Sequence, residues 1–145
     1  MRYWDASGIV SLCARDGHYE IAGPLINDDG EIVTWWGTLT EGFSAFARLK
    51  RSGEMSGGKE LSSGMRLREL AGNWIEIQPS DALRELANKA LWRHELKAMD
   101  AFQLAAALVW GNGRGDGLEF VTFDQRLARA AAWEGFKVLP AYQEA

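Results

Sequence analysis

The sequence predicts an α/β protein with a central, mainly parallel sheet of about five strands and helices on both of its faces. Short apolar runs alternate along the chain with longer segments of helical periodicity. A repeated order of strand, helix and strand implies right-handed crossovers, which place the strands in parallel and the helices on both sides. The chain has 145 residues, of which 47% are hydrophobic, enough for one sizeable core. We therefore expect a single domain over residues 1–145.

The expected strands are short, and all but the first are rich in β-branched or aromatic residues; they cover Arg2–Trp4, Glu31–Thr34, Trp74–Ile77, Glu119–Phe123 and Lys137–Leu139. The expected helices lie between them, where apolar residues recur three or four positions apart; they cover Ser7–Arg15, His18–Ile26, Thr38–Arg51, Lys59–Ala71, Ser80–His94, Met99–Trp110 and Gln125–Trp133.

Two glycine-rich segments are expected to be loops. Ser52–Gly64, with the sequence SGEMSGGKELSSG, is the one shift in composition and predicts a surface loop, with a flap over the functional site as the alternative. Gly111–Gly117, with the sequence GNGRGDG, follows a helix and precedes a strand. Phosphate-binding loops require the opposite order, so this segment is interpreted as a connection.

Charge and cysteine content narrow the class of protein. A charge at Asp5 interrupts the N-terminus before any stretch of signal-peptide length, and the longest apolar run, Leu104–Trp110, is far too short to span a membrane. The single cysteine, Cys13, cannot form an internal disulfide and is flanked by apolar residues, as a small buried side chain would be. These observations predict a soluble protein of the reducing cytoplasm with no membrane partner.

The net charge of -4 speaks against nucleic-acid binding, which depends on contacts of Lys and Arg with phosphates. One segment departs from this acidic average and carries an excess of positive charge. Residues 46–72 contain six basic side chains against three acidic ones. This excess predicts either a track for RNA phosphates, with Arg48, Lys50 and Arg51 as its candidates, or a solvated helical face.

Four carboxylates stand at the edges of otherwise apolar segments: Asp5, Glu41, Asp100 and Asp124. Asp5 and Asp124 each follow a predicted strand, whereas Glu41 and Asp100 lie in the first turns of predicted helices. Ligands of an open parallel sheet bind beyond the carboxyl ends of its strands, so we expect the four side chains to converge there. The alternative for each is a structural role at a helix N-terminus, including a capping box formed by Thr38 and Glu41.

Several carboxylates that meet at one site repel each other unless a cation lies between them. Mg²⁺ and Mn²⁺ prefer oxygen ligands and keep open positions for water and a phosphate, which predicts hydrolysis of a phosphodiester by metal-activated water. Zinc is not expected, because His18 and His94 lie too far apart in sequence to have ligand spacing. Ser7 and Thr122 are hydroxyls near two of the acids and are expected to hydrogen-bond to them.

The segments that carry the acids are YWDAS, T-x-x-E before an alanine-containing helix, L-K-A-x-D-A-x-x-L-A-A-A, and V-T-F-D-x-R-L-A. In combination they resemble the PIN-domain ribonucleases, specifically the VapC type of toxin in bacterial toxin–antitoxin pairs. The resemblance implies a three-layer α/β/α fold and a metal-dependent endoribonuclease. Asp5, Glu41 and Asp100 would be the principal ligands of the metal, and Asp124 the fourth acid. It also implies an antitoxin partner and a homodimer.

One position departs from the family pattern. Gln103 stands where a histidine is expected in many relatives, three residues after Asp100 and on the same helical face. It is expected to tune hydrogen bonding near the site without removing the metal. Trp35 and Trp36 precede the Glu41 helix, and we weigh a role in stacking RNA bases against burial in the core.

Two other functions are weighed against the ribonuclease. The first is a protein-binding or RNA-binding module that keeps the fold but does not cut, and metal-dependent cleavage would distinguish the two. The second is a phosphatase or phosphotransferase that forms an aspartyl phosphate. That class needs a D-x-D strand end, whereas Asp5 is followed by Ala6 and Ser7, and we regard it as disfavoured.

Overall fold

A computed structural model of the chain describes residues 1–143. Its centre is one parallel sheet of five strands in the order β3-β2-β1-β4-β5. The strands are β1 (Arg2–Trp4), β2 (Ile32–Trp35), β3 (Ile75–Ile77), β4 (Glu119–Val121) and β5 (Lys137–Leu139). β1 is central because it pairs with both β2 and β4, with Tyr3 opposite Val33 on one side and Phe120 on the other.

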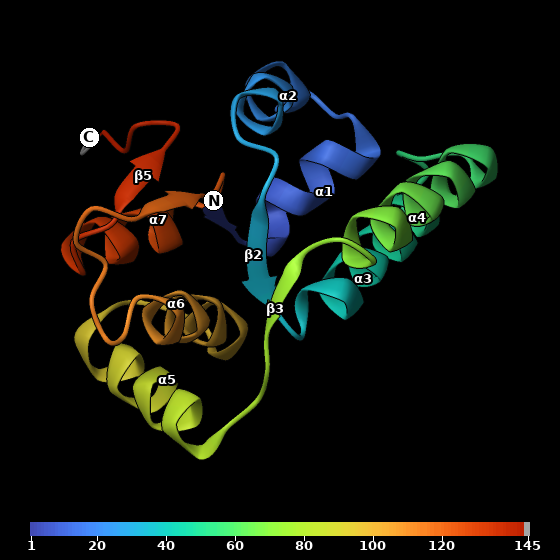
Figure 1. Ribbon diagram of the computed structural model, residues 1–145. Helices are drawn as coiled ribbons and strands as arrows, with labels where there is room; N and C mark the ends of the chain where they lie inside the picture. Colours follow the sequence, from blue (N-terminus) through green and yellow to red (C-terminus); the bar gives the residue numbers. More distant parts are fainter. Residues whose placement is uncertain (144–145) are drawn as a thin grey trace.

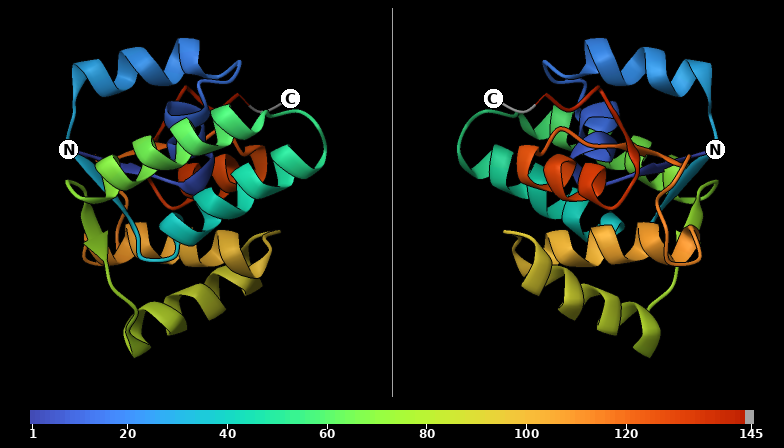
Figure 2. Two further views of the ribbon diagram at one scale, coloured as in Figure 1. Left: turned by 90° about the vertical axis from the view of Figure 1, so that its right-hand side faces the viewer. Right: turned by 90° about the vertical axis from the view of Figure 1, so that its left-hand side faces the viewer.

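Four helices cover one face of the sheet (Figure 1): α1 (Ala6–Ala14), α2 (Tyr19–Asp28), α3 (Thr38–Arg51) and α4 (Gly57–Ala71). The opposite face is covered by α5 (Asp81–Arg93), α6 (Ala98–Trp110) and α7 (Gln125–Trp133). From both sides α3 runs alongside α4, and α5 alongside α6 (Figure 2). The predicted three-layer α/β/α fold with a parallel sheet is confirmed.

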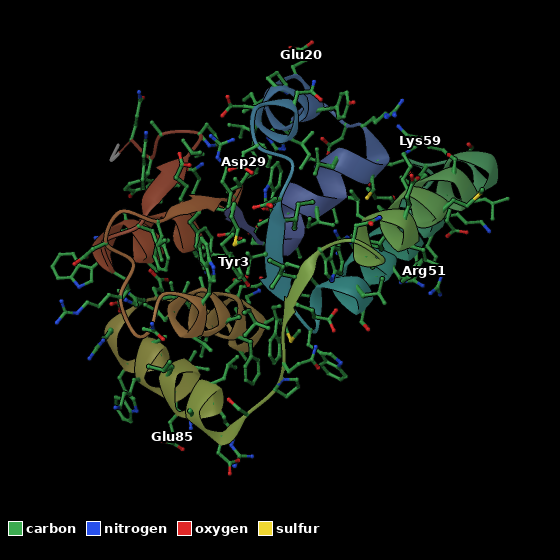
Figure 3. All side chains as sticks on the ribbon, in the orientation of Figure 1. Tyr3, Glu20, Asp29, Arg51, Lys59 and Glu85 are labelled. Carbon is green, nitrogen blue, oxygen red and sulfur yellow. The ribbon has the colours of Figure 1, made fainter. Side chains whose placement is uncertain are left out.

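The two cores follow from the alternation of side chains along the strands. In β1, Tyr3 packs with α5, α6 and α7, whereas its neighbour Trp4 packs with the helices of the other face. Phe120 and Val121 divide in the same way in β4. Both faces of each central strand are therefore buried, which explains why these strands read as continuous apolar runs. Figure 3 shows Tyr3 in the interior, and Arg51 and Glu85 near the outside.

The predicted elements agree with the structure to within a few residues, with one correction. Ser52–Gly64 was expected to be a surface loop, but its second half belongs to α4, which begins at Gly57. The reason is local: Ser56 adopts an extended conformation, and its hydroxyl accepts a hydrogen bond from the Lys59 N–H, at 3.1 Å, the geometry of a helix N-cap. The adjoining Met55 is buried, so this segment is not a free flap.

Cys13 is buried, as its apolar neighbours predicted. Burial raises the pKa of its thiol to about 12. The side chain therefore stays neutral and packs as a small apolar group.

Candidate active site

Asp5 lies where β1 passes into α1. Its backbone N–H donates to the Val121 carbonyl at 3.1 Å, which continues the β1–β4 ladder by one residue. Its carboxylate accepts from the Gly8 N–H at 2.8 Å and so caps α1. Asp5 therefore takes the structural role expected at a helix N-terminus, at the point where strand β1 ends.

The side chain of Asp5 is held by two hydroxyls. Ser7 Oγ donates to it at 2.7 Å and Thr122 Oγ1 at 2.6 Å. Ser7 in turn accepts from the Phe123 N–H at 2.9 Å. Asp5 is only 3% exposed and makes no ion pair with any residue in 1–143. Its orientation is therefore fixed by neutral donors from β1–α1 and from the β4–α7 connection.

Asp124 follows β4 and caps α7, where it accepts from the Leu127 N–H at 2.9 Å. β4 is the neighbour of β1, so Asp5 and Asp124 emerge at the same edge of the sheet. This is the convergence predicted from their positions after two strands.

Glu41 lies in the first turn of α3 and is not part of a capping box. The N-cap of α3 is Gly37, with no side-chain hydrogen bond. Instead, the Glu41 carboxylate accepts a short hydrogen bond from Gln103 Nε2 on α6. Thr38, the expected partner in the box, accepts from the same Gln103 nitrogen at 3.0 Å.

Gln103 is the centre of a buried polar network. Its amide oxygen accepts from the Tyr3 hydroxyl at 2.6 Å. Beyond Thr38, the Thr34 hydroxyl shares a 2.8 Å hydrogen bond with Thr38 and donates to the Trp4 carbonyl at 2.7 Å. The network ties α3 and α6 to the central strands. Sequence reasoning singled out Gln103 and missed Tyr3 and Thr34, because a tyrosine and a threonine within apolar strands carry no sign of a polar partner.

Asp100 occupies the first turn of α6 without capping it, because the N-cap is Lys97 and no side chain bonds there. Burial raises the pKa of Asp100, and the negative charge of Asp124 raises it further, while Lys97 and Arg126 act in the opposite sense. The negative charge of Asp124, which caps the neighbouring helix α7, therefore acts on Asp100 in the first turn of α6.

The acids perturb one another in a chain of repulsions. Burial, opposed by its hydrogen bonds, raises the pKa of Asp5 to about 6, and Asp124 contributes to the rise. Burial raises the pKa of Glu41 to about 7, with contributions from Asp5 and Asp100. Each acid thus interacts with at least one other, and no cation is paired with any of them within the described part of the chain. Repulsion of this kind between carboxylates is relieved when a divalent cation lies among them.

The donor set suits Mg²⁺ or Mn²⁺ by its chemistry, since it consists of carboxylate oxygens. Within residues 1–143, no group of three or more His, Cys, Asp or Glu side chains lies close enough to form a preassembled cage. Mg²⁺ retains several waters and requires few protein ligands, so an open arrangement is compatible with it. The two histidines have separate partners, His18 stacking on Phe123 and His94 contacting Glu134.

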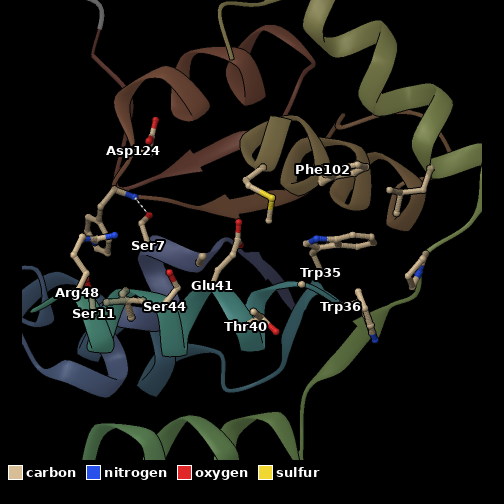
Figure 4. A pocket seen from close by; sticks show the side chains of 18 of the residues that line it. Ser7, Ser11, Trp35, Trp36, Thr40, Glu41, Ser44, Arg48, Phe102 and Asp124 are labelled. Atoms are coloured by element: carbon tan, nitrogen blue, oxygen red, sulfur yellow. Dashed lines mark hydrogen bonds between the residues drawn. The ribbon is translucent and has the colours of Figure 1, made fainter. Parts of the chain in front are cut away.

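A cleft of about 1250 Å³ lies over this edge of the sheet. Glu41 and Asp124 line it, together with Ser7. Figure 4 shows Arg48 toward one end and Trp36 toward the other, with Glu41 between them. Asp5 and Asp100 are not among the residues that line the cleft. Of the three basic candidates, only Arg48 lines it; Lys50 pairs with Glu60 at 3.5 Å, and Arg51 lies outside.

Among residues 1–143 no helix combines the length and hydrophobicity needed to cross a bilayer. The family model described as the PIN domain matches residues 2–132. A comparison with curated proteins gave no match.

Solved structures of similar fold cover most of the chain. VapC20 of Mycobacterium tuberculosis, described as a sarcin–ricin loop cleaving toxin, is 18% identical with a TM-score of 0.67, covering 90% of this chain and 95% of its own. PAE2754 of Pyrobaculum aerophilum is 21% identical with a TM-score of 0.67, over 96% and 91%. A toxin–antitoxin complex of Klebsiella pneumoniae is 18% identical with a TM-score of 0.57, over 87% and 88%.

Proposed function

This chain belongs to the PIN-domain family, and we propose that it is a metal-dependent endoribonuclease that acts as the toxin of a toxin–antitoxin pair. The observation that carries the proposal is the set of mutually repelling acids Asp5, Glu41, Asp100 and Asp124 at the carboxyl edge of the sheet. A protein gains nothing in stability by leaving buried carboxylates without a counter-charge. Their arrangement is explained by a ligand that supplies positive charge.

We assign Asp5, Glu41 and Asp100 as the principal ligands of Mg²⁺ or Mn²⁺, and Asp124 as the fourth acid. When bound, such an ion would supply a water molecule that loses its proton readily. The ion would also offset negative charge on a phosphate. The chain's own residues provide the orientation. Ser7 and Thr122 hold the Asp5 carboxylate, and Gln103 holds that of Glu41.

RNA is the proposed substrate because Glu41 and Asp124 line a cleft large enough for several nucleotides. Metal chemistry at a phosphodiester also requires no serine, cysteine or histidine nucleophile, and both histidines lie in other contacts. A VapC toxin and a toxin–antitoxin complex among the similar folds support the assignment as a toxin. They likewise support a cognate antitoxin as the protein partner. We also propose that the chain forms a homodimer, which measurement of its mass in solution would test.

A binding module without catalytic activity is the second candidate. It is favoured by the lack of a preassembled metal cage among the described residues. In that case the acids would serve as hydrogen-bond acceptors for a protein partner, and no cleavage would occur.

The deciding experiment is incubation of purified, antitoxin-free protein with total RNA, with and without Mn²⁺ or Mg²⁺, followed by mapping of the new RNA ends. We expect cleavage that needs the ion and is lost in Asp100→Asn. A matched control is Glu85→Gln, which changes an exposed acid of α5 that lies outside the cleft and should cut normally. Absence of cleavage in the wild type with both ions, or equal cleavage by Asp100→Asn, would favour the binding module.

A further inference from the structure

The cleft extends well beyond the acids, and its two ends have a different chemistry from its centre. Trp36 lies toward one end and Arg48 toward the other (Figure 4). The volume of about 1250 Å³ exceeds that of most sites for one small ligand. The cleft therefore extends on both sides of Glu41, as a longer binding surface would.

Trp36 differs from its neighbour Trp35 in what it touches. Trp35 is buried and stacks on Phe102, with ring centroids 5.6 Å apart and an angle of 10° between the planes. Trp36 is 54% exposed and meets Trp35 edge-on, at 72°. Trp35 is thus part of the core, whereas Trp36 has no stacking partner on its ring faces among the described residues.

The backbone holds Trp36 in place. Its N–H donates to the Ile77 carbonyl of β3 at 3.0 Å, so the indole projects from the edge of the sheet rather than from a free loop. Figure 4 shows its side chain at the end of the cleft away from Arg48. A rigid aromatic ring with an open face is the feature that stacks a nucleobase in proteins that bind single strands.

Arg48 supplies a positive charge at the opposite end. It lies two turns after Glu41 on α3 and lines the cleft. It makes no ion pair within residues 1–143, unlike Arg84, which contacts Asp81 at 3.1 Å. A guanidinium without an acidic partner beside a cleft suits a phosphate of a bound strand.

We propose that the cleft binds single-stranded RNA, with one nucleobase stacked on Trp36 and the backbone on the other side of the acids held by Arg48. The inference rests on the proposed ribonuclease function and deepens it, because it assigns where the strand lies relative to the scissile phosphate. A duplex cannot offer an unpaired base face to Trp36, so the strand must be single at that position.

The test is the affinity for a short, cleavage-resistant 2′-O-methyl RNA strand in Ca²⁺, measured by fluorescence anisotropy. Trp36→Ala should bind about tenfold or more weakly, in keeping with the energy of one base–aromatic stack. Trp36→Phe should keep most of the affinity. Trp133→Ala is the matched control, since Trp133 is 80% exposed at the end of α7 and lies outside the cleft; it should bind as the wild type does. Circular dichroism checks that each variant is folded.

A second strand, abasic at every position, separates stacking from phosphate contacts. The wild type should prefer the strand with bases, and Trp36→Ala should lose much of that preference. Equal binding of the two strands by the wild type, or unchanged affinity in Trp36→Ala, would overturn the inference. Dissociation of a dimer in Trp36→Ala without loss of RNA affinity would also overturn it, by assigning Trp36 to self-association.

These outcomes are independent of cleavage. A wild type that binds through Trp36 but never cuts RNA would refute the proposed hydrolysis and leave this inference standing. A wild type that cuts RNA, together with a Trp36→Ala variant that binds and cuts RNA equally well, would refute this inference and leave the proposed hydrolysis standing.

Discussion

Gln103 and Glu41, 62 positions apart in the chain, are joined by a hydrogen bond from the amide nitrogen of Gln103 to the carboxylate of Glu41. Gln103 is itself oriented by the Tyr3 hydroxyl, which donates to its amide oxygen. At this position many relatives are expected to carry histidine. The glutamine connects a candidate metal ligand on α3 to β1, the central strand of the sheet.

Replacing Gln103 by Leu should weaken both folding and metal binding. It leaves the Tyr3 and Thr38 hydroxyls short of a buried partner, which should lower the free energy of unfolding by about 1–3 kcal/mol. It also frees the Glu41 carboxylate, and loss of such an orienting bond typically costs about 10–100-fold in metal affinity. Urea denaturation and calorimetric titration with Mn²⁺ measure the two effects.

Tyr3→Phe is the control for that prediction. It removes one hydrogen bond of the network but keeps the contact between Gln103 and Glu41, so stability should fall by about 1 kcal/mol with little change in Mn²⁺ affinity. Equal metal affinity in Gln103→Leu and wild type would show that the network serves stability alone.

Asp100→Asn should stabilise the metal-free protein at pH 7. Asp100 caps no helix, and burial together with Asp124 raises its pKa, so its charge is unfavourable in the folded state. Its removal should raise the free energy of unfolding slightly, by less than a buried charge would because Asp100 is partly exposed, as measured by urea denaturation in EDTA. Asp81→Asn, at an exposed pair, should change it little. A loss of stability in Asp100→Asn would indicate a structural role instead.

The stability of the metal-free protein should depend on Glu41 and pH. The pKa of Glu41 is about 7 in the folded protein against an ordinary value of 4.5, so the folded state holds the proton more tightly. The contribution of Glu41 is therefore fully present below pH 4.5 and is lost as pH rises to about 7. The unfolding free energy of the wild type, less that of Glu41→Gln, should fall by about 2–3 kcal/mol over this interval. A difference that stays constant from pH 4.5 to 7 would contradict the raised pKa.

Metal binding should release protons near pH 6. At that pH the raised pKa values of Asp5 and Glu41 leave these carboxyls partly protonated, and a cation binds only their ionised forms. The affinity for Mn²⁺ should rise between about pH 5 and 7.5. Calorimetry in two buffers of different ionisation enthalpy counts the protons released. Glu41→Gln should release fewer, and Glu85→Gln, an exposed residue of α5, should match the wild type.

Arg48→Gln should flatten the salt dependence of RNA binding. If Arg48 contacts one phosphate, the slope of log affinity against log salt should change by about one unit. Lys50→Gln and Arg51→Gln are internal comparisons, because Lys50 already pairs with Glu60 and neither lines the cleft. Filter binding across a salt series measures the slope for each of the three variants. An unaltered slope in Arg48→Gln would identify the basic part of α3 as a solvated face.

Local signals predicted much of this fold. The strands β1 and β5 and the helices α3 and α7 have the bounds expected from periodicity, because each is limited by a visible change of pattern. The start of α4 at Gly57, two residues before the expected Lys59, lies in a segment that was also expected to be a loop. Its first turns are rich in glycine and serine, and the Ser56 cap and the packing of Leu67 in the core support the helix there.

The sequence by itself determined that Asp5 and Asp124 follow strands, and a parallel sheet must then bring them to one edge. Only the tertiary structure decided which helices face that edge and which side chains meet there. The pairing of Gln103 with Glu41 and Tyr3, and the open face of Trp36 beside the buried Trp35, depend on the strand order β3-β2-β1-β4-β5 and on how α6 packs against it. Periodicity reports which face of an element is buried, but not against which distant element, and these contacts join residues far apart in the chain.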